Sequence, residues 1–138
     1  MLTGVIVHVR EISLGRESFR HSSVAWGREG EDTVASLLAK EGWEILARNF
    51  RAGHGEIDIV ASKGDVLSFV EVKFWSANGA QELNRAISPL KISRIVETSK
   101  IFVAKHRQYS EKRIRYDVFF LGSDGKPTRY EGAFDETR

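Results

Sequence analysis

The chain has 138 residues, of which 41% are hydrophobic and 29% charged, the balance of an ordinary globular domain with one core. It contains no cysteine, which excludes disulfides, zinc–thiolate sites and thiol nucleophiles. No apolar run approaches the ~20 residues of a membrane span, and the amino terminus lacks a secretory apolar region with a cleavage site. A cytoplasmic location without membrane contact is therefore expected.

Acidic and basic residues are unevenly distributed, although the net charge is only +2. Residues 28–73 hold six Lys/Arg and nine Asp/Glu, whereas residues 82–115 hold nine Lys/Arg and three Glu. An acidic segment followed by a basic one is typical of a metal site beside a phosphate-binding surface. Solvated helices carry similar runs, so both interpretations stay open.

The first 21 residues combine a short apolar run (residues 4–9) with a basic stretch, and we expect an N-terminal arm there. Residues 22–138 are expected to form a single domain. A helix is predicted from residue 22 or 23 to about residue 41, where Gly42 ends it. At 100° per residue, Glu31 shares the stripe of Val34 and Leu38. Glu31 therefore either faces the sheet or reaches solvent at the edge of that stripe.

Residues 43–51 read as the first core strand. Near its end, Asn49 has two interpretations: a hydrogen bond that stabilises a turn, or a contact to a phosphate. His54, in the loop that follows, is interpreted as a surface residue or as a substrate contact.

Two further strands, residues 55–60 and 66–73 on either side of a short turn at residues 62–65, form a predicted hairpin because apolar residues alternate in each. With Lys63-Gly64 as a two-residue turn, three cross-strand pairs follow: Ser62 with Asp65, Asp58 with Phe69, and Glu56 with Glu71. Residues two apart share a face of a strand, so the pattern predicts two groups of residues. On one face lie Glu56, Asp58, Val60, Leu67, Phe69, Glu71 and Lys73, and on the other lie Ile57, Ile59, Val70 and Val72.

This arrangement brings Asp58, Glu71 and Lys73 together on one side of the hairpin. Ionisable groups are costly to bury without a reason. Two carboxylates could hold a hard divalent cation such as Mg²⁺, which would activate a water and stabilise charge on a phosphoryl oxygen. Lys73 could orient or deprotonate that water. The alternative is a solvated sheet face on which Glu71 and Lys73 form an exposed ion pair.

Ser88 and Pro89 are typical of a helix start, and the predicted helix runs to about residue 108. Lys91, Arg94 and Lys105 lie along one flank of its apolar stripe. Such a row either holds a phosphate backbone or is a solvated helix face.

A strand is predicted at residues 112–121, in which Arg115 and Asp117 are expected to form a structural ion pair. A short edge strand at residues 128–134 completes the order of one helix, three strands, one helix and two strands. This order predicts an α/β domain in which helices flank a mixed β-sheet.

Several motifs together resemble one family: GREGEDTVA (27–35), ILARNFR (45–51), GEIDIV (55–60), FVEVK (69–73), AISPLKISRI (86–95) and RYDV (115–118). Their order and spacing are similar to those of the YraN-like family of bacterial proteins. That family is similar in turn to the restriction-endonuclease-like PD-(D/E)XK superfamily, which includes Holliday-junction resolvases. The resemblance covers about residues 24–121 and implies a restriction-endonuclease-like fold.

The resemblance also implies site residues. The metal-binding aspartate of the superfamily falls on Asp58, its second acid on Glu71 and its lysine on Lys73. Val72 would offer its backbone carbonyl to the metal, and Glu31 matches the helical acid of the resolvase-like branch. Mg²⁺- or Mn²⁺-dependent hydrolysis of nucleic acid follows, with DNA favoured over RNA and a homodimer as one alternative for the assembly.

Two hypotheses result. In the first, the protein is an endonuclease in which Asp58, Glu71 and Glu31 serve the metal and Lys73 positions the nucleophile. Its nucleic-acid contacts are then expected from Lys91, Arg94, Lys105 and Asn49. In the second, the protein binds nucleic acid or acts as a scaffold on the same fold without catalysis. Direct binding of a divalent metal distinguishes them.

Overall fold

The computed structural model describes residues 23–74, 87–122 and 124–136, so the predicted N-terminal arm lies outside the described residues. The predicted order of elements is confirmed, and α4 ends three residues earlier than predicted. The elements are α2 (Ser23–Lys40), β1 (Glu44–Ala52), β2 (Gly55–Lys63), β3 (Val66–Phe74), α4 (Pro89–Lys105), the 3₁₀ helix η2 (Arg107–Tyr109), β4 (Arg113–Leu121) and β5 (Pro127–Phe134).

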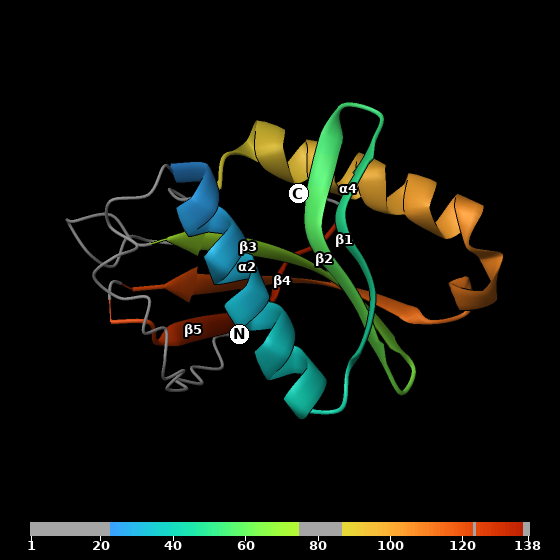
Figure 1. The fold of residues 1–138 in the computed structure, drawn as a ribbon. Coiled ribbons are helices and arrows are strands. Elements are labelled where there is room, and N and C mark those ends of the chain that lie inside the picture. Colours follow the sequence, from blue (N-terminus) through green and yellow to red (C-terminus); the bar gives the residue numbers. More distant parts are fainter. Residues whose placement is uncertain (1–22, 75–86, 123, 137–138) are drawn as a thin grey trace.

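The five strands form one sheet in the order β1-β2-β3-β4-β5. Neighbours are antiparallel except β3 and β4, which are parallel and are connected through α4. The two helices cover opposite faces, as the residues packed with each of them show (Figure 1). The predicted α/β fold, a mixed sheet flanked by helices, is confirmed and is consistent with a restriction-endonuclease-like arrangement.

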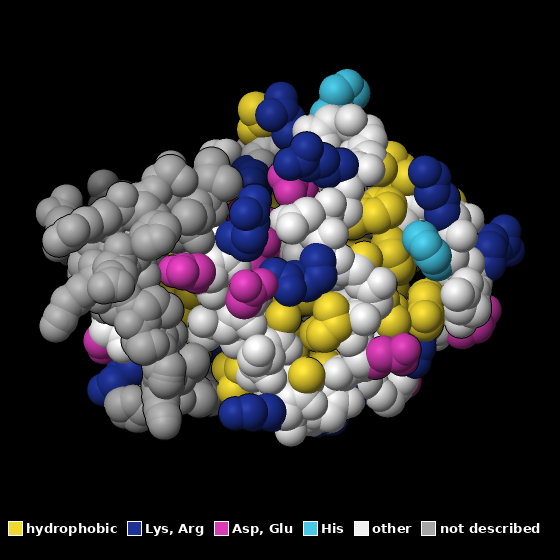
Figure 2. Space-filling view, in the orientation of Figure 1, with side chains coloured by type: hydrophobic (Ala, Val, Ile, Leu, Met, Phe, Trp, Pro, Cys, Tyr) yellow, Lys and Arg dark blue, Asp and Glu magenta, His cyan; other side chains and the backbone are white. Residues whose placement is uncertain are grey.

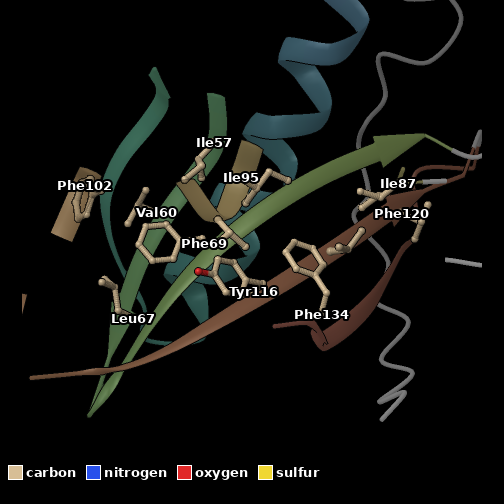
Figure 3. Packing of buried hydrophobic residues seen from close by; sticks show 12 residues of the cluster. Ile57, Val60, Leu67, Phe69, Ile87, Ile95, Phe102, Tyr116, Phe120 and Phe134 are labelled. Atoms are coloured by element: carbon tan, nitrogen blue, oxygen red, sulfur yellow. The ribbon is translucent and has the colours of Figure 1, made fainter. Parts of the chain in front are cut away.

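Aromatic rings fill the core between α4 and the sheet (Figure 3). Tyr116 stacks between Phe134 and Phe69, with ring centroids 5.0 and 5.8 Å away, and Phe102 of α4 meets Phe69 edge-on at 5.8 Å. The Tyr116 hydroxyl lies 2.7 Å from Ser99 Oγ, so its polar end is satisfied inside the core. This packing fixes the position of α4 on the sheet.

A buried carboxylate fixes the β5 edge of the sheet on the other side. Asp117 accepts hydrogen bonds from Arg115 Nε (2.9 Å), Ser68 Oγ (2.6 Å) and the backbone N–H of Gly132 (2.9 Å). These bonds satisfy the buried charge and link β3, β4 and β5. The predicted structural pairing of Arg115 with Asp117 is confirmed.

The register of the β2–β3 hairpin differs from the prediction. Lys63 pairs with Val66, so the turn is Gly64-Asp65. Gly64 has φ +59°, which suits the first central position of a type II′ turn, where glycine is preferred. The register is offset by two residues, so three predicted pairs are wrong: Ser62 with Asp65, Asp58 with Phe69, and Glu56 with Glu71. An even offset keeps side chains on the same face, which preserves the predicted faces of β3.

One face assignment on β2 is also wrong. Ile57 packs in the same core as Val60, although strict alternation predicts opposite faces. The β1 residues that pair with Ile57 and Val60 are also three positions apart, and both pack against that core. Asn49 lies between these two β1 residues and has φ +52°. Both strands therefore switch faces together at Asn49 and Asp58. A period-two pattern cannot predict this kink, because the pattern assumes regular strand geometry throughout.

Candidate active site

Strands β2 and β3 separate at Asp58. The last cross-strand pair of their ladder joins Ile59 to Val70. Beyond this pair, Asp58 Oδ2 accepts a hydrogen bond of 2.8 Å from the backbone N–H of Val72. Figure 1 shows β2 curving away from β3 in this half of the sheet. The side chain of Asp58 thus replaces the missing backbone partner of β3.

Asp58 and Glu71 form a closely interacting acid pair at this opening. The side chain of Glu71 is only 6% exposed. Burial raises the pKa of Asp58 to about 8, and the charge of Glu71 adds to this rise, whereas the hydrogen bond from Val72 opposes it. Burial also raises the pKa of Glu71, while Lys91 and Lys73 act in the opposite direction. A pair of acids that resist ionisation, one buried and the other partly buried, is typical of a functional site.

Lys91 forms an ion pair with Glu71. Ser88 caps α4 by accepting a hydrogen bond of 3.1 Å from the backbone N–H of Lys91, and Pro89 occupies the first helical position. In this first turn, Lys91 Nζ lies 3.3 Å from Glu71 Oε2. The predicted phosphate ligand therefore pairs with a predicted metal ligand. Sequence patterns alone gave no indication of this contact, because it depends on how α4 docks on β3.

Glu31 lies on α2, which approaches the sheet closely at Gly30. A Cβ at Gly30 would come within 2.4 Å of the Phe74 ring. Glu31 is partly buried, its charge contributes to the raised pKa of Asp58, and its Oε1 accepts a hydrogen bond of 3.0 Å from Asn49 Nδ2. Of the two readings, Glu31 thus faces the sheet.

Asn49 donates hydrogen bonds to two acidic side chains, which differs from both of its predicted roles. Its amide also reaches Glu56 Oε2, at 3.3 Å. Its φ of +52° is uncommon outside glycine, and asparagine is one of the few residues that tolerate it. Uncommon backbone conformations tend to occur at functional sites. Asn49 therefore joins the strand kink to the placement of Glu31.

The donor set fits a hard divalent cation. Glu71 Oε1 is buried without a hydrogen-bond partner among the described residues, and Asp58 and Glu71 repel each other when both are ionised. Mg²⁺ prefers oxygen ligands, uses one or two carboxylates and keeps several waters. The described residues contain no group of three His, Asp or Glu side chains gathered as metal ligands. The fit therefore rests on two carboxylates with backbone and water oxygens.

The remaining predicted residues divide by distance from the acid pair. Lys73 is close enough to act on the charge of Glu71. Arg94 is exposed, one turn along α4 from Lys91. Lys105 is the last residue of α4, about 21 Å from Lys91 at 1.5 Å per residue, and so does not share their location. Figure 2 shows basic and acidic side chains side by side between α2 and the β1–β2 hairpin.

Fold and site together define an α/β protein, consistent with a restriction-endonuclease-like arrangement, with an acid pair where two strands part. The model of the uncharacterised protein family UPF0102 matches residues 30–121, and the chain belongs to this family, the YraN-like proteins. A UPF0102 protein of Treponema pallidum (strain Nichols) is 41% identical over 98 residues, covering 71% of this chain and 78% of the relative. Another from Rhodopseudomonas palustris is 32% identical over 111 residues, covering 80% and 84%.

The matched segment includes the three acids Glu31, Asp58 and Glu71 and also Lys73. The names of these relatives state no activity, so function has to be argued from the site. None of the helices in the described residues is long and apolar enough to cross a membrane.

Proposed function

We propose that this protein is a metal-dependent endonuclease that hydrolyses phosphodiester bonds in nucleic acid. One observation carries the proposal: Asp58 and the buried Glu71 form an acid pair beside Lys73 and Lys91, in which Glu71 Oε1 has no hydrogen-bond partner among the described residues. A pair that only stabilised the fold would not leave a buried carboxylate oxygen without a partner.

The residues have separable tasks in this mechanism. Asp58 and Glu71 would hold Mg²⁺ or Mn²⁺, with the Val72 carbonyl as a third protein oxygen and Glu31 acting through water. The ion supplies Lewis-acid activation of a water and of the phosphoryl oxygen. Lys73 would hold or deprotonate the attacking water. Lys91, which pairs with Glu71 in this structure, would contact the phosphate when the ion is bound. DNA is the favoured substrate because the motifs resemble those of resolvases.

The test is cleavage by full-length protein of linear, flapped and four-way DNA and of RNA, with Mg²⁺ or Mn²⁺. Asp58→Asn and Lys73→Met are expected to lower the cleavage rate by about 10²-fold or more, because each removes a group that acts at the reacting phosphate. Asp65→Asn, in the exposed hairpin turn, is the matched control that should keep the wild-type rate. Equal cleavage by wild type and Asp58→Asn would identify a contaminating nuclease and overturn the proposal.

A second candidate, a nucleic-acid-binding or scaffolding protein without catalysis, is favoured by the Lys91–Glu71 contact of 3.3 Å. A lysine that neutralises Glu71 permanently would make a metal unnecessary. Calorimetric titration with Mn²⁺ in the presence of a substrate strand separates the two candidates. Binding that Asp58→Asn abolishes supports the nuclease, whereas no binding at millimolar metal supports the second candidate.

A further inference from the structure

A pocket of about 590 Å³ lies beside the acid pair, between the β1–β2 turn and the first turns of α4. Arg51, His54, Lys91 and Arg94 line it, and Ile95 contributes an apolar wall. Pockets of 300–1,000 Å³ accommodate whole small ligands, so this volume exceeds what a phosphate alone requires. Lys91 lines this pocket and also pairs with Glu71 of the acid pair, so the two sites are contiguous.

The walls of the pocket are fixed by close contact between the turn and the helix. Thr98 Oγ1 donates a hydrogen bond of 3.0 Å to the carbonyl oxygen of Ala52. A Cβ at Gly55 would lie 2.7 Å from Thr98 Oγ1 and 2.8 Å from the Arg94 carbonyl oxygen. Real Cβ atoms do not approach other atoms so closely, so only glycine allows the turn to sit this near α4. The pocket is thus built by the fold rather than left between mobile side chains.

Positive charge predominates in the pocket lining. Arg51 lies 3.5 Å from Glu56, which also lines the pocket, and His54 lies 3.5 Å from Glu97. Arg94 makes no ion pair with any carboxylate of the described residues, so its guanidinium is the cation most available to an anion. Guanidinium groups suit phosphate because their planar donors match its oxygens.

We propose that this pocket binds one nucleotide unit of the substrate strand, with Arg94 on its phosphate, next to the phosphodiester held at Asp58 and Glu71. The inference rests on the proposed function, and it adds where the strand runs: from the acid pair, past Lys91, into the groove under the β1–β2 turn. The apolar wall at Ile95 and the volume accommodate the sugar. The pocket thereby positions the strand, whereas the acid pair performs the chemistry.

The experiment measures binding of a fluorescein-labelled DNA strand by anisotropy, from about 50 to 200 mM salt. Asp58→Asn protein with Mg²⁺ and wild type in EDTA provide two backgrounds without cleavage. In both, Arg94→Gln is expected to weaken binding several-fold and to reduce the slope of log K against log salt by about 0.7–0.9, one phosphate contact. Gly55→Ala is expected to weaken binding without a change of charge. The matched control is Arg107→Gln, an exposed arginine beyond the far end of α4.

An unchanged affinity and slope in Arg94→Gln, or an equal effect of Arg107→Gln, would overturn the pocket while leaving the nuclease proposal intact. If wild type cleaves none of the substrates but Arg94→Gln specifically weakens binding, the pocket proposal stands and the nuclease proposal is rejected. A free nucleoside monophosphate that binds as tightly as the strand would also overturn the proposal, because the pocket would then serve a small molecule.

Discussion

The acid pair makes a prediction about stability that does not depend on finding a substrate. Asp58→Asn removes a negative charge from the pair, yet its side-chain oxygen can still accept the hydrogen bond that Val72 donates at 2.8 Å. The substitution is also nearly isosteric, so packing around it should persist. The difference between variant and wild type therefore isolates the cost of ionising Asp58 inside the protein.

The sign and size of the effect follow from the pKa of Asp58, which rises from 3.8 to about 8. Between these values the folded state binds more protons than the unfolded state, so the free energy of unfolding falls as pH rises. The full shift corresponds to about 5–6 kcal/mol at 1.36 kcal/mol per unit. Solvent screening of this partly exposed carboxyl reduces the value, and we expect about 2 kcal/mol. At ~3–5 °C per kcal/mol, this is about 6–10 °C in melting temperature.

Thermal unfolding at pH 4, close to the ordinary pKa of 3.8, and at pH 8 tests this expectation. Asp58→Asn should melt within a few degrees of wild type at pH 4 and clearly above it at pH 8. Added Mg²⁺ or Mn²⁺ should raise the melting temperature of wild type at pH 8 and leave that of Asp58→Asn unchanged. Asp65→Asn, whose side chain is 82% exposed, controls for the loss of a charge alone. If the difference between Asp58→Asn and wild type is the same at both pH values, Asp58 ionises as it would in water and the burial reasoning is wrong.

Three further variants test the neighbours of the pair. Lys91→Met removes the cation 3.3 Å from Glu71, so the melting temperature of this variant at pH 8 should fall by several degrees. Added Mn²⁺ should raise the melting temperature of the variant more than that of wild type. Equal metal responses would show that Lys91 and the ion do not compete. Asn49→Gly keeps a backbone of φ +52° accessible, whereas Asn49→Ala also strains it by about 1–2 kcal/mol. Both variants should weaken Mn²⁺ binding equally in calorimetry, because both lose the hydrogen bond to Glu31. Only Asn49→Ala should lower the melting temperature markedly. An unaltered metal affinity would show that Asn49 does not belong to the site.

Much of the fold follows from local patterns in the sequence. The start of α4 could be predicted because Ser88 and Pro89 act through a cap that involves only their own helix turn. The faces of β3 could be predicted because this strand is regular and packed on both sides. The hairpin turn was misplaced by one residue, since Gly64 suits either central position of a primed turn, and the structure places it first.

The site itself was only partly accessible from the sequence. The GEID and FVEVK motifs located Asp58, Glu71 and Lys73 through their spacing. The contact of Lys91 with Glu71 and the bonds of Asn49 to Glu31 and Glu56 depend on tertiary packing, and no periodicity encodes them. A signal for Asn49 did exist: asparagine is one of the few residues that suit a left-handed backbone position inside a strand.

The composition of the pair distinguishes a functional role from a structural one. If Glu71 served only the fold, a glutamine would cost less to bury at this position, and an apolar residue in place of the Lys91–Glu71 pair would often be neutral or stabilising. The chain instead keeps two acids whose pKa values are raised by burial, in a gap that β2 opens by leaving β3. Both α2 and α4 are packed on the sheet beside this gap, so the strand separation is maintained by rigid elements. A destabilising pair of acids held between two packed helices is the arrangement expected if binding of a cation, rather than folding, supplies the compensating free energy.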